Sequence, residues 1–222
     1  MMGYQVTAGF YILDYFWFEE RMLTTWDIIN EEFGYMLVFG DYVFIPFTFN
    51  IQCHFLTVMR EYDLPWLWLV VQLALFALGY YIFRTSNSQK NQFKVNPKEL
   101  INGKEPEVFE GKLLVSGFWG LGRHMNYTGD LLMAFAYCLP CGIVYGPKPY
   151  FYFIYLSLLL LHRAYRDDAK CQEKYGSLWT RYCKRVPYVF VPFKWDRYLQ
   201  SAGKFLFGVT NPESKQEKQR TH

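Results

Sequence analysis

The chain alternates long apolar stretches with short polar segments. Residues 64–83 contain no charged side chain, and Gln72 is their single clearly polar residue. A helix of that length crosses a hydrocarbon core of about 30 Å. Residues 131–161 are apolar apart from Lys148, and prolines and glycines near their middle predict two helices joined by a tight turn. The pattern therefore predicts a membrane protein that contains a helical hairpin.

Two segments nearer the N-terminus are apolar but less regular. Residues 6–18 form a short apolar patch around Asp14, and residues 33–58 contain Asp41 among several polar residues. Polar groups at membrane depth are costly unless they face a cavity or a partner. Together with the two stretches above, these segments predict an all-α fold, a polytopic membrane helical bundle with four to five transmembrane helices.

Basic residues gather in two segments that adjoin apolar stretches. Residues 84–112 are predicted to form a polar loop, and residues 162–194 a basic interfacial segment. By the positive-inside rule both segments face the cytosol. We interpret residues 1–202 as one membrane domain and residues 203–222 as a solvated basic tail. The net charge of +3 argues against general nucleic-acid binding.

Cysteine spacing gives little support for a metal centre. Cys138 and Cys141 have C-x-x-C spacing but flank Pro140 inside an apolar stretch. No second Cys or His pair stands nearby in the sequence to complete a zinc site. We therefore expect no bound metal.

Dense charge follows the apolar run in residues 160–182. Helical spacing places Arg163, Asp167, Lys170 and Lys174 on one side of a helix. Such a cluster at a membrane border is suited to a polar, phosphorylated ligand bound next to lipid.

Residues 113–130 combine glycines with flat side chains. Trp119 and Tyr127 offer aromatic faces, and Asn126 offers both a donor and an acceptor. Glycines allow close backbone approach, so the stretch is suited to a planar heterocycle with a polar edge. An aromatic belt at the membrane interface is the alternative interpretation.

The isolated lysines and histidines leave alternatives open. Lys90 and Lys94 share one face if their segment is helical, which would suit a phosphate clamp or ordinary positive-inside charge. His124 and His162 have the pKa range of proton carriers. Interfacial histidines are more often simply hydrogen-bonded, so we assign neither a catalytic role.

These motifs together resemble the sterol reductase family, which includes the Δ14-sterol reductases, the 7-dehydrocholesterol reductases, the fungal C-24(28) reductases and the lamin B receptor. Residues 160–182 are similar to the family's C-terminal signature, and residues 113–130 to its second conserved stretch. Residues 79–91 are similar to the stretch before that. The resemblance covers residues 14–195 and implies an enzyme of the endoplasmic reticulum membrane or nuclear envelope that crosses the membrane several times. Such enzymes reduce a sterol double bond with NADPH.

The resemblance also implies which residues bind the cofactor in a cytosol-facing C-terminal pocket. The positions carried over are Lys90, Lys94, Leu114, Trp119, Asn126, Tyr127, Asp167, Cys171, Gln172, Glu173, Lys174, Tyr175 and Tyr182. Lysines at such positions neutralise phosphates, and a carboxylate accepts hydrogen bonds from ribose hydroxyls. The run 86–97 resembles the Δ14-reductase branch most, which favours Δ14 reduction over Δ7.

The chain departs from the family in length. Its usual members are about twice as long, and the signature of their N-terminal half does not occur here. The chain therefore resembles a C-terminal half. A second copy of the chain or a partner chain would have to supply the missing spans around a sterol substrate and membrane lipid.

Reduction of an isolated alkene requires an acid as well as a hydride donor. The acid protonates one carbon, and the hydride reaches the other. Asp14, Tyr15 and Asp41 are the candidates, because the acid needs a raised pKa, as a carboxyl or phenol in an apolar pocket would have.

Two other functions remain open from the sequence. Isoprenylcysteine-type membrane methyltransferases share an Arg-His-x-x-Tyr-x-Gly stretch and a hairpin. They usually carry paired glutamates where this chain has Arg166 and Asp167. The other alternative is a truncated paralogue without catalysis, or a nuclear-envelope scaffold, as the lamin B receptor partly is.

Overall fold

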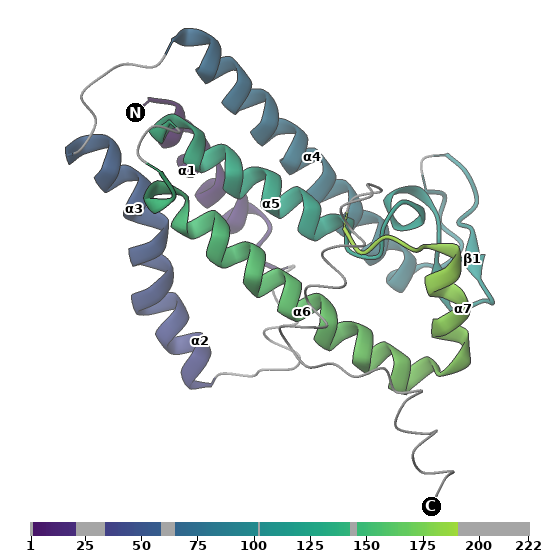
Figure 1. The fold of residues 1–222 in the computed structure, drawn as a ribbon. Helices are drawn as coiled ribbons and strands as arrows, with labels where there is room; N and C mark the ends of the chain where they lie inside the picture. Colours follow the sequence, from purple (N-terminus) through teal and green to yellow (C-terminus); the bar gives the residue numbers. More distant parts are fainter. Residues whose placement is uncertain (1, 21–33, 59–64, 102, 143–145, 191–222) are drawn as a thin grey trace, which may run out of the picture. The chain divides into compact units, whose positions relative to one another are not determined.

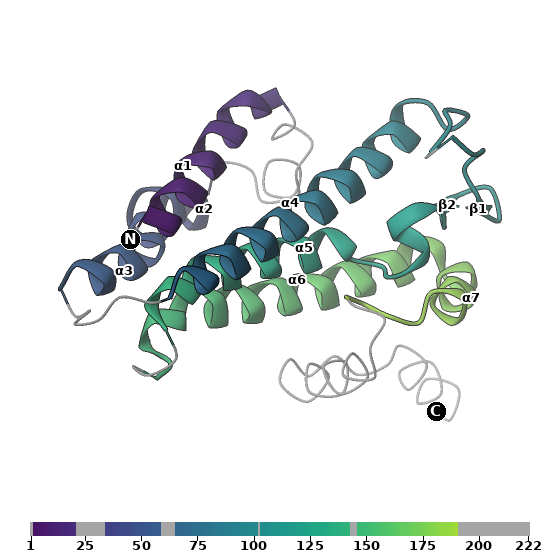
Figure 2. The same cartoon turned by 90° about the horizontal axis from the view of Figure 1, so that it is seen from above.

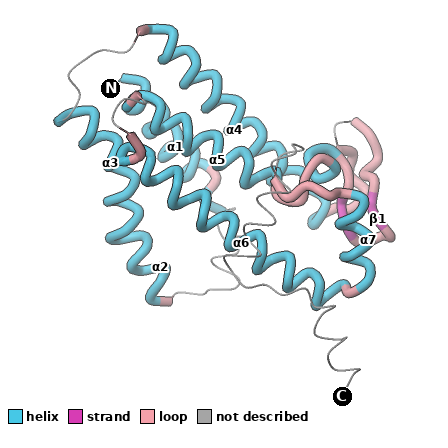
Figure 3. The backbone as a smooth tube through the Cα atoms, viewed as in Figure 1, coloured by secondary structure: helices cyan, strands magenta, loops and turns pink. Residues whose placement is uncertain are grey.

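The computed structural model describes residues 2–20, 34–58, 65–101, 103–142 and 146–190. Helices dominate these residues, as predicted, and one short pair of strands accompanies them (Figure 3). The chain forms two compact units. Unit 1 comprises Met1–Gly79 and Leu131–Leu156, and unit 2 comprises Tyr80–Asp130 and Ser157–His222. The predicted tail, residues 203–222, lies outside the described residues.

Unit 1 begins with helix α1 (Met2–Trp17), followed by α2 (Tyr35–Phe39), the π-helical turn η3 (Gly40–Phe44) and α3 (Ile45–Val58) (Figure 1). The last three elements form one continuous helical segment. Pro46 explains the π turn, because it lacks an N–H and its ring displaces the carbonyl one turn earlier. The Ile45 N–H bonds to the carbonyl of Gly40 instead. The described part of the predicted segment 33–58 is thus helical.

Helices α1 and α4 (Trp66–Val95) pack closely within unit 1. A Cβ atom at Gly3 would overlap the side-chain oxygen of Gln72, so a larger residue there would require the Gln72 side chain to shift. The Gln72 amide donates to the Thr7 hydroxyl at 3.5 Å, and that hydroxyl donates to the Gly3 carbonyl at 2.9 Å. Gln72 is thereby satisfied although only 2% of it is exposed.

The predicted hairpin is confirmed in the described residues. Helix α5 (Met125–Cys138) ends in the 3-10 turn η5 (Leu139–Cys141), and η6 (Lys148–Tyr150) leads into α6 (Phe151–Tyr175). Pro140 lies in η5, and Gly142 follows it with a positive φ of 71°. These two residues end the helical path because proline lacks the donor and glycine accepts the left-handed backbone.

Unit 2 contains the polar half of α4, strands β1 (Val108–Phe109) and β2 (Leu113–Leu114), the 3-10 turn η4 (Gly117–Gly120), the start of α5, the charged half of α6, and α7 (Ser177–Arg185). The strands pair antiparallel, with Val108 opposite Leu114. Figures 1 and 2 show this hairpin beside α7. The ring of Phe109 contacts that of Tyr182, and Trp179 and Val186 complete the cluster between them.

The predicted polar loop over residues 84–112 is wrong in its first part, because α4 continues to Val95. Tertiary contacts described below hold this polar extension. The β-hairpin was also not predicted, since each strand has only two residues and shows no alternating pattern.

Within the described ranges, α4 alone is long and apolar enough to cross a membrane, and residues Tyr42–Val58 form a shorter apolar helix. The number of four to five crossings therefore stays a prediction.

Candidate functional site

The polar end of α4 positions the turn that carries Trp119. The indole N–H of Trp119 donates to the Ser86 carbonyl at 2.8 Å, and the Phe118 N–H donates to Oε1 of Gln89 at 3.1 Å. Gly117 has a φ of 60°, and a Cβ there would lie 2.5 Å from Oε1 of Gln89. A glycine is required for this close approach, and η4 is thereby fixed against α4.

Lys90 extends from the same face of α4 toward Trp119. Its ammonium lies 4.7 Å from the centre of the indole ring, which is the geometry of a cation–π contact. Only 6% of Trp119 is exposed. The predicted residues Lys90 and Trp119 are therefore in contact.

Asp167 of α6 faces the same group of side chains. Its Oδ2 lies 3.8 Å from Nε2 of His124, and the His124 ring stacks on Tyr127 with centroids 4.9 Å apart. Burial raises the pKa of Asp167, while the positive charge of Lys90 opposes that rise. Burial, together with Lys90 and the neighbouring Arg123, lowers the pKa of His124 to about 3, so this imidazole is neutral at pH 7.

Three buried polar atoms in unit 2 have no hydrogen-bond partner among the described residues. They are Oδ1 of Asn126, Oγ1 of Thr128 and Nε2 of Gln89. Asn126 uses its amide N–H to reach Oδ1 of Asn87 at 3.3 Å, which leaves its own oxygen available. Buried groups of this kind are costly unless a ligand or water satisfies them. The oxygen of Asn126 could accept a hydrogen bond from a polar ligand bound beside it.

Leu114 and Tyr182 are core side chains of unit 2. Leu114 packs with Trp119 and Ile101, whereas Tyr182 packs with Trp179. Burial raises the pKa of Tyr182 to about 12, so its hydroxyl stays protonated. Both residues therefore belong to the packed core around Trp119 and Trp179, and neither supplies a charge.

The residues from 171 to 175 have mixed surroundings. Burial raises the pKa of the Cys171 thiol to about 12, which makes it a poor nucleophile. Gln172 closes the α6–α7 turn, because its amide donates to the Gly176 carbonyl at 3.2 Å and its oxygen accepts from the Thr180 hydroxyl at 3.4 Å. Glu173 and Lys174 are exposed, and the Lys174 ammonium lies 5.2 Å from the Tyr175 ring centre.

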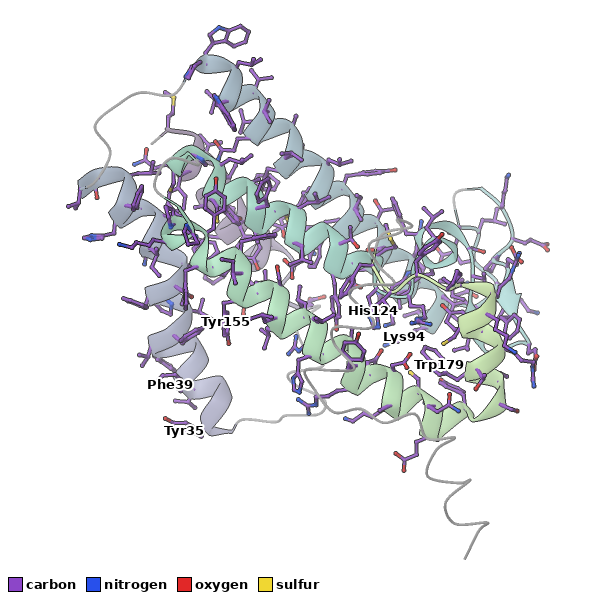
Figure 4. All side chains as sticks on the ribbon, viewed as in Figure 1. Tyr35, Phe39, Lys94, His124, Tyr155 and Trp179 are labelled. Atoms are coloured by element: carbon purple, nitrogen blue, oxygen red, sulfur yellow. The ribbon has the colours of Figure 1, made fainter. Side chains whose placement is uncertain are left out.

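Figure 4 labels Lys94, His124 and Trp179, which come from three separate segments of unit 2. Lys94 lies one turn beyond Lys90 on α4 and is exposed. The helical spacing predicted for these two lysines is therefore present.

Sequence reasoning missed the partners that hold Asp168. The Trp179 indole N–H donates to Oδ1 of Asp168 at 3.1 Å, and Nη2 of Arg123 lies 4.0 Å from the same oxygen. Successive helical residues point about 100° apart, so Asp167 and Asp168 face different surroundings. That spacing was the one signal in the sequence that the two carboxylates differ.

The predicted acids belong to unit 1, whereas the predicted cofactor positions belong to unit 2. Asp14 and Tyr15 belong to α1 and Asp41 to η3. Tyr15 is 44% exposed, and its ring contacts that of Phe16. Their roles stay predictions.

Within the described residues, no three His, Cys, Asp or Glu side chains form a group that would hold a metal ion.

The model of the Ergosterol biosynthesis ERG4/ERG24 family matches residues 3–195, so the chain belongs to that family. A Delta(14)-sterol reductase of Arabidopsis thaliana is 51% identical over 87% of this chain and 52% of its own length. The Delta(14)-sterol reductase TM7SF2 of Mus musculus is 49% identical over 82% of this chain and 44% of its own. A 7-dehydrocholesterol reductase of Xenopus laevis is 42% identical over 86% of this chain and 43% of its own length. The chain thus spans about half the length of these relatives.

Proposed function

We propose that this chain forms the cofactor-binding half of an NADPH-dependent sterol reductase that reduces a ring double bond, Δ14 in preference to Δ7. The relatives named Delta(14)-sterol reductase support the sterol class and this order. The observation that carries the proposal is the grouping of Lys90, Trp119 and Asp167 around one site in unit 2. That grouping unites residues from α4, η4 and α6.

The side chains present fit a dinucleotide phosphate. Lys90, Lys94 and Lys174 supply positive charge for phosphate groups, and the Asp167 carboxylate accepts hydrogen bonds from ribose hydroxyls. Trp119 lies buried beneath Lys90, and Tyr127 is stacked on His124, so we expect these rings to flank the cofactor. The available Oδ1 of Asn126 is an acceptor for a polar ring edge. NADPH, when bound, supplies the hydride.

The chain itself must supply or position the proton. Asp14, Tyr15 and Asp41 are the proposed donors, since each lies in an apolar segment of unit 1. The donor protonates one alkene carbon, and the hydride then reaches the resulting cation at the other carbon. An Asp14→Asn or Asp41→Asn variant that retained full turnover would remove that residue from the set.

The proposal also includes the membrane topology. The chain crosses the endoplasmic reticulum membrane four to five times, and its cofactor site faces the cytosol. The family and the apolar helix α4 support a membrane location.

NADPH binding to the detergent-purified chain tests the proposal. Saturable binding that prefers NADPH over NADH and S-adenosylmethionine should be lost in Lys90→Ala and Asp167→Ala. Lys98→Ala, an exposed lysine outside the predicted set, is the matched control and should bind normally. Absence of NADPH binding in the wild type would leave a scaffold, and preference for S-adenosylmethionine would indicate a methyltransferase.

A further inference from the structure

His124 has a backbone fixed from two directions. Its N–H donates to the Val189 carbonyl at 2.7 Å, and its own carbonyl accepts from the N–H groups of Tyr127 and Thr128 at 3.0 and 3.3 Å. The residue therefore joins the segment after α7 to the first turn of α5. The main chain at His124 is thus held in place, and it sets the starting point of the side chain.

The imidazole lies between two residues of the proposed cofactor site. One ring face stacks on Tyr127 with an angle of 8° between the planes, and Nε2 points to Oδ2 of Asp167 at 3.8 Å. Only 6% of His124 is exposed. Solvent is therefore a weak competitor for this ring.

The charges around the ring keep it neutral. Lys90 of α4 and Arg123 beside it are the cations that act on His124, and Asp167 of α6 is the facing carboxylate. Burial with these cations lowers the pKa of His124 to about 3. A neutral imidazole carries one N–H, and a carboxylate facing Nε2 selects the tautomer protonated there.

We infer that His124 is a positioning residue whose stacked ring fixes Tyr127. Its Nε2–H faces the Asp167 carboxylate at 3.8 Å, which is too long for a hydrogen bond but close enough to orient that carboxylate electrostatically. This inference rests on the proposed function, because Asp167 and Tyr127 matter as cofactor positions. Without this contact, Asp167 would have the rotational freedom of a partly exposed side chain. Its neighbour Asp168 is already engaged by Trp179 and so does not compete for His124.

Two substitutions distinguish the contribution of the Nε2–H donor from that of the stacked ring. His124→Phe keeps the stack on Tyr127 and removes the donor, so NADPH affinity should fall about tenfold. His124→Gln places an amide N–H near the former Nε2 and should bind within about threefold of the wild type. In an Asp167→Asn background, His124→Phe should cause no further loss. Equal affinity of His124→Phe and wild type would overturn the inference.

The pKa of Asp167 gives a second readout that needs no cofactor. Infrared titration of carboxyl bands, with Asp167→Asn to identify the band, should show a higher pKa in His124→Phe, because a donor to the charged form is lost. This shift in a chain that binds no NADPH would sink the proposed function and leave the positioning role standing. Normal NADPH binding without the shift would overturn the positioning role alone.

A folding defect in His124→Phe would not block the test. The amide N–H of His124→Asn is too short to reach Asp167, whereas that of His124→Gln is long enough. The two variants therefore differ in whether a donor reaches the carboxylate. Weaker binding and a higher Asp167 pKa in His124→Asn than in His124→Gln support the inference. Identical values in these two variants contradict it.

Discussion

The ammonium of Lys90 lies 4.7 Å from the centre of the Trp119 ring, and the same helix holds the edge of that ring. Ser86, one turn before Lys90 on α4, accepts the indole N–H at 2.8 Å. Residues four apart share a helix face. One face of α4 therefore fixes both the orientation of the indole and a positive charge above it.

This arrangement predicts the effect of Trp119→Phe. A smaller aromatic ring remains, but the indole N–H that donates to the Ser86 carbonyl is lost, so the free energy of unfolding should fall by about 1 kcal/mol or more. Thermal unfolding in detergent measures the change. Trp66→Phe is the control, because Trp66 is 76% exposed and should leave the melting temperature unchanged. Equal stability of Trp119→Phe and wild type would show that the indole bond contributes nothing.

Gly117 offers a second test of the contact between η4 and α4. Gly117→Ala combines an unfavourable positive φ with a Cβ 2.5 Å from Gln89, and should destabilise the protein by about 1–3 kcal/mol. Gly103→Ala is the matched control, since Gly103 has a φ of 76° and no atom within 4 Å of the added Cβ. The difference between the variants isolates the steric term. A Gly103→Ala change as large as that of Gly117→Ala would contradict a steric role for Gln89.

The polar half of α4 shows where sequence patterns stop being informative. The hairpin could be predicted because Pro140 interrupts a long apolar run. Residues 84–95 have no apolar period, and their helix depends on contacts with η4 that only the fold provides. Sequence spacing did place Lys90 and Lys94 on one face once a helix was assumed.

The candidate site divides in the same way. Lys90, Trp119 and Asp167 were predicted through family resemblance, and the structure brings them together. The role of His124 was not predictable, because it depends on a carboxylate from α6 and a carbonyl at position 189, both distant in sequence. Burial of its ring is likewise a property of the folded chain.

The β-hairpin and α7 are joined by an exposed ion pair with a defined pH dependence. Arg181 donates to both carboxylate oxygens of Glu110 at 2.9 and 2.7 Å, and these hydrogen bonds lower the pKa of Glu110 below its ordinary value of 4.5. A carboxyl whose pKa is lower in the folded than in the unfolded protein stabilises the fold at pH values above its unfolded pKa. That stabilisation is lost as the pH falls through the folded value.

Glu110→Gln should therefore lower the melting temperature slightly at pH 7 and progressively less as the pH falls below 4.5. The effect is small because the pair is exposed, and high salt should reduce it further. Thermal unfolding at several pH values measures it, with Glu105→Gln, a carboxylate nearby in the sequence, as the control. A Glu110→Gln effect that is constant with pH would indicate that the carboxylate charge plays no part.

Asp167 and Asp168 provide the sharpest comparison, because neighbours on one helix should have opposite roles. Asp168→Ala removes the acceptor of the buried Trp179 N–H, so the free energy of unfolding should fall by about 1–3 kcal/mol while folded molecules keep their NADPH affinity. Asp167→Ala should retain stability, since its carboxyl is itself destabilised by burial, and should lose NADPH affinity at least tenfold. Unfolding curves and NADPH titrations of both variants distinguish the two effects. Loss of both properties in both variants would mean that α6 supports the site as a whole, and that the two carboxylates are not specialised.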